Sequence, residues 1–177
     1  MRRRLWLMFG SLFLFVVLGF CIVAVNYFMP KLTSVDPKNV QVAQYALDHS
    51  PMDHVTRVYW FTGGPLEPTV VGTDAFHKTL YVFVNGQSTV VVYQNQVITP
   101  TKASTIAQHH EGKSQVVSVV PGYVNPNTTT TFGALTSDNA VYEVTLLLPN
   151  GRYAYVYEDM YTGAVLWSFS TTLHISL

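Results

Sequence analysis

Cysteine is almost absent from this 177-residue chain, and charged residues are scarce. The single cysteine is Cys21, so residues 26–177 contain none. That part of the chain cannot be a disulfide scaffold, and it offers no thiol nucleophile. Only 11% of the residues are charged, and residues 30–177 carry seven Lys/Arg against ten Asp/Glu, a formal charge of −3. This balance argues against nucleic-acid binding, which needs a basic surface.

Sequence signatures of catalysis and metal binding are missing as well. The chain has no GxSxG elbow, no HExxH motif and no Cys/His cluster. Of six histidines only His109 and His110 are adjacent, and neighbours on a helix point about 100° apart, which favours a helix-end role over a shared metal ion. The two glycines of 62–68 join predicted strands, so a phosphate cradle is not expected. We therefore predict no catalytic residue, no cofactor, no metal and no small-molecule substrate.

One long hydrophobic run is present, in residues 5–25, which carry no charge. At about 1.5 Å per residue such a helix spans roughly 30 Å, the thickness of a bilayer core. Three arginines precede the run, so the positive-inside rule places residues 1–4 in the cytoplasm and the rest outside. The run is too long for a cleaved signal peptide, and Phe20 before Cys21 does not suit lipoprotein processing. We predict a single-pass cell-membrane protein with an extracellular C-terminal part.

Residues 26–35 are a short tether, and a first unit is predicted over 36–95. Asp36 can cap a helix whose first position suits Pro37, and an apolar stripe follows until Ser50-Pro51 ends it. The stripe consists of Val40, Ala43, Tyr45, Ala46 and Leu47. Asn85-Gly86 joins the last two of four predicted strands as a hairpin. These strands are 54–61, 68–74, 79–85 and 88–94.

The same order repeats in a second unit, 96–177. Thr99 and Pro100 begin a helix, and Gly112 ends it. A Thr-rich loop, 125–139, interrupts the unit, and its Thr run could also form a ragged strand. The predicted strands are 114–124, 140–149, 152–159 and 164–171. The fold class is therefore α+β, with two helix-and-sheet units that we expect to pack as one rigid body.

The end of the second unit resembles a PepSY domain. The stretch concerned is YEVTLLLPNGRYAYVYEDMYTGAVL. The whole arrangement resembles the TseB-like cell wall elongation regulators of Gram-positive bacteria, through VVGTDAFHKTLYVFV, ITPTKASTIA and the closing hairpin. That family has one membrane span followed by two cystatin-like or PepSY-like units. The long loop 125–139 departs from it.

The resemblance implies a non-enzymatic accessory role in peptidoglycan synthesis. It implies binding to a penicillin-binding protein of the elongation machinery, outside the cell. Two alternatives stay open: a PepSY-type peptidase inhibitor or chaperone, and a module that binds cell-wall polymer. The family pattern carries no set of catalytic residues to transfer to this chain.

Two carboxylates near the C-terminus, Glu158 and Asp159, are the strongest enzymatic candidates. A glycosidase needs two carboxylates on one substrate, but adjacent strand residues point to opposite faces. Asp159 precedes Tyr161-Thr162-Gly163 and suits the first position of a turn. We therefore expect the corner of a hairpin here.

Aromatic side chains are the candidates for partner contact. Tyr153, Tyr155 and Tyr157 share one face of their strand, while Ala154 and Val156 share the other. If the small face packs under the helix, the tyrosines line an open face; the reverse arrangement would put them in the core. Tyrosine and tryptophan are common at protein interfaces. Tyr59, Trp60 and Tyr81 could supply a similar surface in the first unit.

Overall fold

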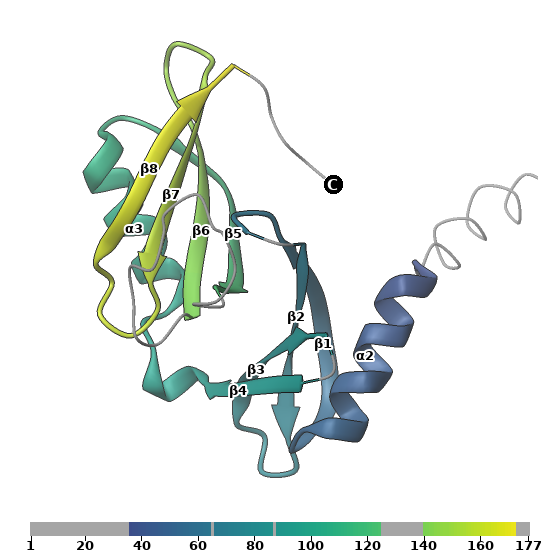
Figure 1. Ribbon diagram of the computed structural model, residues 1–177. Coiled ribbons are helices and arrows are strands. Elements are labelled where there is room, and N and C mark those ends of the chain that lie inside the picture. Colours follow the sequence, from purple (N-terminus) through teal and green to yellow (C-terminus); the bar gives the residue numbers. More distant parts are fainter. Residues whose placement is uncertain (1–35, 65, 87, 125–139, 173–177) are drawn as a thin grey trace, which may run out of the picture. The chain divides into compact units, whose positions relative to one another are not determined.

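The computed structural model describes residues 36–64, 66–86, 88–124 and 140–172 (Figure 1). The predicted cytoplasmic residues 1–4, span 5–25, tether 26–35 and loop 125–139 all lie outside the described residues. No helix in the described ranges is long and apolar enough to cross a membrane. The elements are α2 (Pro37–His49), β1 (Met52–Phe61), β2 (Glu67–Asp74), β3 (Thr79–Asn85), β4 (Ser88–Tyr93), η1 (Gln94–Gln96), α3 (Pro100–Glu111), β5 (Gln115–Tyr123), β6 (Ala140–Leu147), β7 (Tyr153–Asp159) and β8 (Val165–Thr171).

The first sheet is antiparallel with the strand order β1-β2-β3-β4. One of its faces packs with α2, and Ala46 of that helix is fully buried there with Val70 and Leu80. Figure 1 shows α2 beside this sheet. The predicted helical stripe is right at Tyr45, Ala46 and Leu47, but Val40 is 51% exposed.

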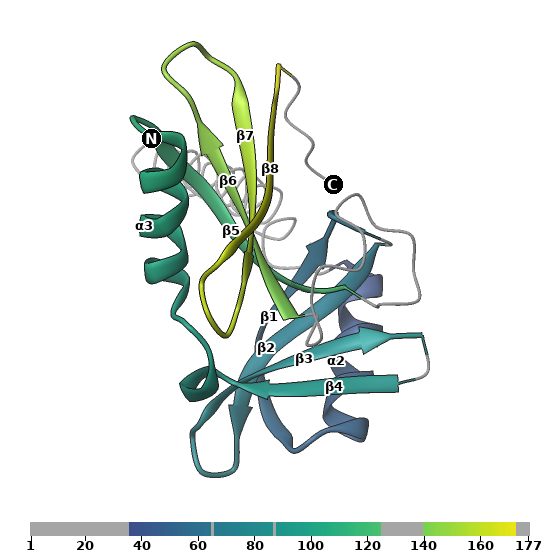
Figure 2. The same ribbon diagram turned by 60° about the vertical axis from the view of Figure 1, so that its left-hand side comes forward.

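The second sheet is antiparallel with the order β5-β6-β7-β8. Helix α3 lies along it (Figure 2), and Ala103 and Ala107 are buried against the sheet face that carries Ala154 and Val156. Small alanine side chains let the helix approach the sheet closely. The predicted order of one helix and a four-stranded sheet, repeated once, is confirmed for the described residues.

Local sequence signals fix the ends of both helices. The Asp36 carboxylate accepts a hydrogen bond of 2.9 Å from the backbone N–H of Lys38. Thr99 caps α3 by accepting from the N–H of Lys102 at 3.2 Å. Gly112 ends α3 with a φ of 80°, a left-handed conformation that side chains disfavour. These predicted caps are confirmed.

Residues Gln41–Leu177 form one compact unit that contains both sheets. A shared core joins them: Tyr81 and Phe83 of the first sheet cluster with Tyr142 and Val144 of the second. This core occupies the face of the first sheet opposite to α2. The first sheet is therefore buried on both faces, which explains its nearly continuous run of buried residues in β3.

Candidate functional site

The predicted tyrosine face of β7 is mostly buried. Tyr155 is 2% exposed and Tyr157 is 3% exposed, and only Tyr153 is half-buried. Of the two arrangements left open by the sequence, the structure has the first: Ala154 and Val156 face α3, so the tyrosines lie on the other side of the sheet. There Tyr155 stacks on Phe169 at 5.0 Å between ring centroids, and Tyr157 stacks on Trp167 at 5.8 Å. The expectation of an open face is wrong for Tyr155 and Tyr157, because neighbouring aromatic rings and Phe61 pack over them.

The three aromatic candidates of the first unit are placed differently from one another. Tyr81 is 3% exposed and belongs to the shared core. Tyr59 and Trp60, at the end of β1, are half-buried, and the guanidinium of Arg57 lies 5.7 Å from the Tyr59 ring centroid. Tyr59, Trp60 and Tyr153 thus keep some exposed surface, and partner contact through them stays a prediction.

Glu143, in the middle of β6, is the most extensively bonded buried acid. Its side chain is 4% exposed on the aromatic side of the second sheet, opposite Tyr157 in the register. Thr62 Oγ1 donates to its two oxygens at 3.2 and 3.1 Å. The Tyr157 hydroxyl and the backbone N–H groups of Thr62 and Gly63 also bond to it. Burial raises the pKa of Glu143, and these hydrogen bonds partly lower it again.

Close packing accompanies this network. Phe61, fully buried, ends β1, and its ring lies on Gly122 of β5, where a β-carbon would clash with it. A β-carbon at Gly63 would likewise clash with the Tyr157 ring. Phe61 and Tyr157 meet edge to face with centroids 6.3 Å apart. The segment after β1 is therefore held against the second sheet by both packing and Glu143.

Glu158 lies on the opposite side of the second sheet. It is opposite Tyr142 in the register, so it shares the α3 side with Ala154 and Val156. Its side chain is fully buried, and neither carboxyl oxygen has a hydrogen-bond partner. Burial raises the pKa of Glu158 to about 8. The carboxyl group is therefore mostly protonated at neutral pH.

Asp159 forms the hairpin corner that the sequence predicts. Its Oδ1 accepts from the backbone N–H of Tyr161 at 2.9 Å and of Thr162 at 2.7 Å, and from the Thr162 hydroxyl at 2.9 Å. Glu143, Glu158 and Asp159 do not converge on one substrate position: Glu143 and Glu158 are on opposite faces, and Asp159 is occupied by its own turn. Sequence reasoning missed Glu143, although a lone acid within AVYEVTLLL is a signal of a buried polar contact.

A buried tyrosine pair connects the two sheets on the α3 side. The Tyr81 and Tyr142 hydroxyl oxygens lie 3.0 Å apart, and the Tyr142 hydroxyl donates to the carbonyl of Ile98 at 3.1 Å. Burial raises the pKa of Tyr142 far above its usual range, so the hydroxyl stays neutral. The pair satisfies polar groups in the core and does not reach the surface.

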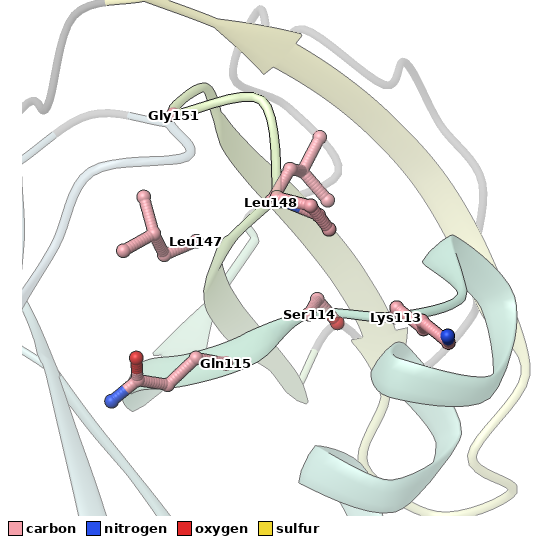
Figure 3. Close-up of a pocket in the computed structure, with 7 residues that line it drawn as sticks. Lys113, Ser114, Gln115, Leu147, Leu148 and Gly151 are labelled. Atoms are coloured by element: carbon pink, nitrogen blue, oxygen red, sulfur yellow. The ribbon is translucent and has the colours of Figure 1, made fainter.

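One surface hollow in the described part of the chain gathers no convergent chemical groups (Figure 3). Its volume is about 430 Å³, and it lies between the start of β5 and the β6–β7 turn, lined by Lys113, Ser114, Gln115, Leu147, Leu148, Pro149 and Gly151. Its only charged side chain is Lys113. His109 and His110 are in the last turn of α3, as predicted. Among the described residues no three His, Cys, Asp or Glu side chains gather as metal ligands would.

Together these elements define an α+β protein of two helix-and-sheet units with a shared core. No known family profile and no curated protein matches the sequence. The solved structure of the YpmB protein from Bacillus subtilis is similar, with a TM-score of 0.60 and 22% identity over 77% of this chain and 99% of that chain. The likeness shows a YpmB-like α+β fold.

Proposed function

We propose that this chain is a non-enzymatic, membrane-anchored extracellular accessory protein that regulates cell wall elongation by binding a penicillin-binding protein. The observation that carries the proposal is the two-unit fold, which matches 99% of the YpmB chain and follows a charge-free segment at residues 5–25. The sequence resemblance to TseB-like regulators supplies the partner class. The absence of converging carboxylates among the described residues supports a binding role over a hydrolytic one.

The anchor is the basis of the mechanism. A membrane span confines the protein to the plane in which a membrane-anchored synthase also moves, which raises the effective concentration of each for the other. The two helix-and-sheet units then present the contact surface to this partner. Binding regulates the partner when this chain binds one conformation of the partner more tightly than the others. The population of that conformation then rises, and the partner's activity changes with it.

Co-purification tests this proposal. The full chain, expressed in its own host and purified from membranes, is probed with fluorescent penicillin, beside a control that contains only residues 1–35. We expect a penicillin-labelled protein to be enriched at least tenfold over the control. Equal labelling of the two samples would reject the proposal.

A cell-wall polymer ligand is the second candidate, and one observation favours it. Trp167 and Phe169 are half-buried on the aromatic side of the second sheet, with ring centroids 4.9 Å apart. Neighbouring aromatic rings that keep some exposed surface suit the apolar faces of sugars. Sedimentation with isolated cell wall distinguishes the candidates: binding that Trp167→Ala removes supports the polymer, and no sedimentation of the intact chain rejects it.

A further inference from the structure

The most exposed large apolar side chain among the described residues is Phe76, which is 81% exposed. It lies in the turn Ala75–Lys78 that joins β2 and β3. Single exposed apolar residues are common and need no explanation by themselves. What distinguishes Phe76 is the rigidity of the turn that displays it.

Asp74 holds this turn in one conformation. Its Oδ1 accepts from the backbone N–H of Phe76 and from that of Lys78, each at 2.9 Å. Its backbone carbonyl accepts from the N–H of His77 at 2.9 Å, and its own N–H donates to the carbonyl of Lys78 at 3.0 Å. Asp74 is only 7% exposed, so its carboxylate stays in place beneath the turn. Little backbone conformational entropy therefore remains to be lost when Phe76 binds a partner.

His77 adds an unusual backbone conformation. It has a φ of 60°, and it is the one non-glycine residue in the described ranges with a positive φ. This region disfavours residues with a side chain, and such strain is found preferentially at functional positions. A glycine would remove the strain; the chain carries an imidazole at that position, beside the exposed phenyl ring.

A polar hollow lies next to the turn. Its volume is about 420 Å³, and it is lined by Lys78, Thr79, Gln94, Asn95 and Thr99. The charged and titratable groups around the turn are Asp74, whose carboxylate accepts from the backbone of the turn, His77, Lys78 and, at the start of the neighbouring β1, Asp53 and His54. The hollow itself contains one cation and no acid, so it suits a carbonyl or carboxylate group.

We propose that this turn is a docking tip, at which Phe76 enters an apolar pocket of a partner protein. Lys78 and the adjoining hollow then receive the acceptor groups at the pocket's rim. A buried aromatic anchor surrounded by polar contacts is the usual arrangement of an interface hot spot. This inference rests on the proposed function, in which the partner is a penicillin-binding protein, and names the residues that would contact it.

The surroundings of Phe76 favour a protein over a lipid surface. It is followed in the turn by His77 and Lys78, and a polar hollow lies beside it. A lipid-binding tip would need a wider apolar face than one phenyl ring beside a polar hollow.

Substitution in the full chain tests the proposal. Phe76→Ser removes the anchor, and Val117→Ser, at a 45% exposed position of β5, is the matched control. Lys78→Glu tests the rim, with exposed Lys113→Glu as its control. Because all four side chains are exposed, thermal unfolding should be unchanged, which separates lost binding from lost folding. We expect Phe76→Ser to lower recovery of the penicillin-labelled partner at least tenfold, Lys78→Glu about threefold or more, and the controls less than twofold.

A photo-crosslinking residue placed at position 76 gives an independent result. We expect an adduct that carries the penicillin label, and none from position 117. Full recovery of the partner by Phe76→Ser would overturn the docking tip and leave the proposed function intact. Adducts with lipid alone would overturn it in favour of a membrane contact. If the wild-type chain recovers no labelled partner, the proposed function and the docking tip both fall.

Discussion

The two sides of the second sheet each bury a carboxyl group, and they treat it differently. On the aromatic side Glu143 bonds to Thr62, Tyr157 and the backbone after β1. On the α3 side Glu158 is fully buried and both its oxygens are without a partner. The first carboxylate is a connection between the sheets, whereas the second lowers stability whenever it is charged. Burial alone therefore does not determine whether an acidic side chain raises or lowers the stability of the fold.

Removing Glu143 should have the largest effect. Glu143→Ala leaves the Thr62 and Tyr157 hydroxyls and buried N–H groups without an acceptor, and such losses cost about 3–5 kcal/mol. Denaturant unfolding of the full chain measures the change. Exposed Asp48→Ala is the control and should stay within about 0.5 kcal/mol. A cost for Glu143→Ala as small as the control's would show that the network does not join the sheets.

The burial of Glu158 predicts that the stability of the folded chain depends on pH. Its pKa rises from 4.5 in the unfolded chain to about 8 in the folded one. Between these two pH values the folded state binds more protons at Glu158 than the unfolded state does. The contribution of Glu158 to stability is therefore highest below pH 4.5, falls as the pH rises, and levels off above about 8. At about 1.4 kcal/mol per pH unit the limit is about 5 kcal/mol, and we expect about 2–4 because the surrounding structure relaxes when the buried group ionises.

Two variants sharpen this prediction. Glu158→Gln keeps the shape and should remove Glu158's share of the pH slope in thermal unfolding. Glu158→Met should in addition stabilise the chain at pH 8, since no charge is left to bury. A slope that is the same in wild type and Glu158→Gln would mean that Glu158 is ionised and satisfied in the folded state.

Tyr142→Phe should cost less, about 1–2 kcal/mol. The substitution leaves the Ile98 carbonyl and the Tyr81 hydroxyl without their partner on the α3 side. Tyr81→Phe keeps the bond to Ile98 and should cost clearly less than Tyr142→Phe. Calorimetry of the two variants and of the double variant gives the coupling between the hydroxyls, and additive costs would contradict their contact.

The hairpin corner at the end of β7 should show the smallest effect. Asp159→Ala removes three hydrogen bonds of the turn, and partly exposed turns of this kind contribute about 1 kcal/mol. Asp159→Asn keeps an acceptor oxygen and should recover most of the loss in thermal unfolding. If alanine costs as much here as at Glu143, the difference between connecting and local carboxylates disappears.

Local signals made most of the fold predictable from the sequence. Pro37, Thr99 and Gly112 mark helix ends through contacts within a few residues, and alternation marks the strands. Each prediction of this kind depends on neighbours in the chain. For the same reason alternation separates the two faces of β7, although it leaves open whether Ala154 and Val156 are the residues that meet α3.

What covers each face could not be predicted, because it depends on residues distant in the chain. Tyr155 and Tyr157 alternate as an exposed face would, and they are buried by partners such as Phe61 and Phe169. Glu143 meets Thr62 across 81 residues. Phe76 carries no signal in the sequence, because a single apolar residue in a turn has no periodicity. Its fixed position is visible only from the hydrogen bonds that Asp74 accepts in the folded chain.

The packing of the Phe61 ring on Gly122 has a consequence for the order in which the chain can fold during synthesis. Phe61 is synthesised long before its partners, Gly122 and Tyr157, exist. At roughly 5–20 residues per second, about 5–20 s pass between Phe61 and Tyr157 on the ribosome. During that interval the first sheet lacks the part of its core that the second sheet supplies. We therefore expect the first sheet to reach its full stability only after the second sheet has been synthesised.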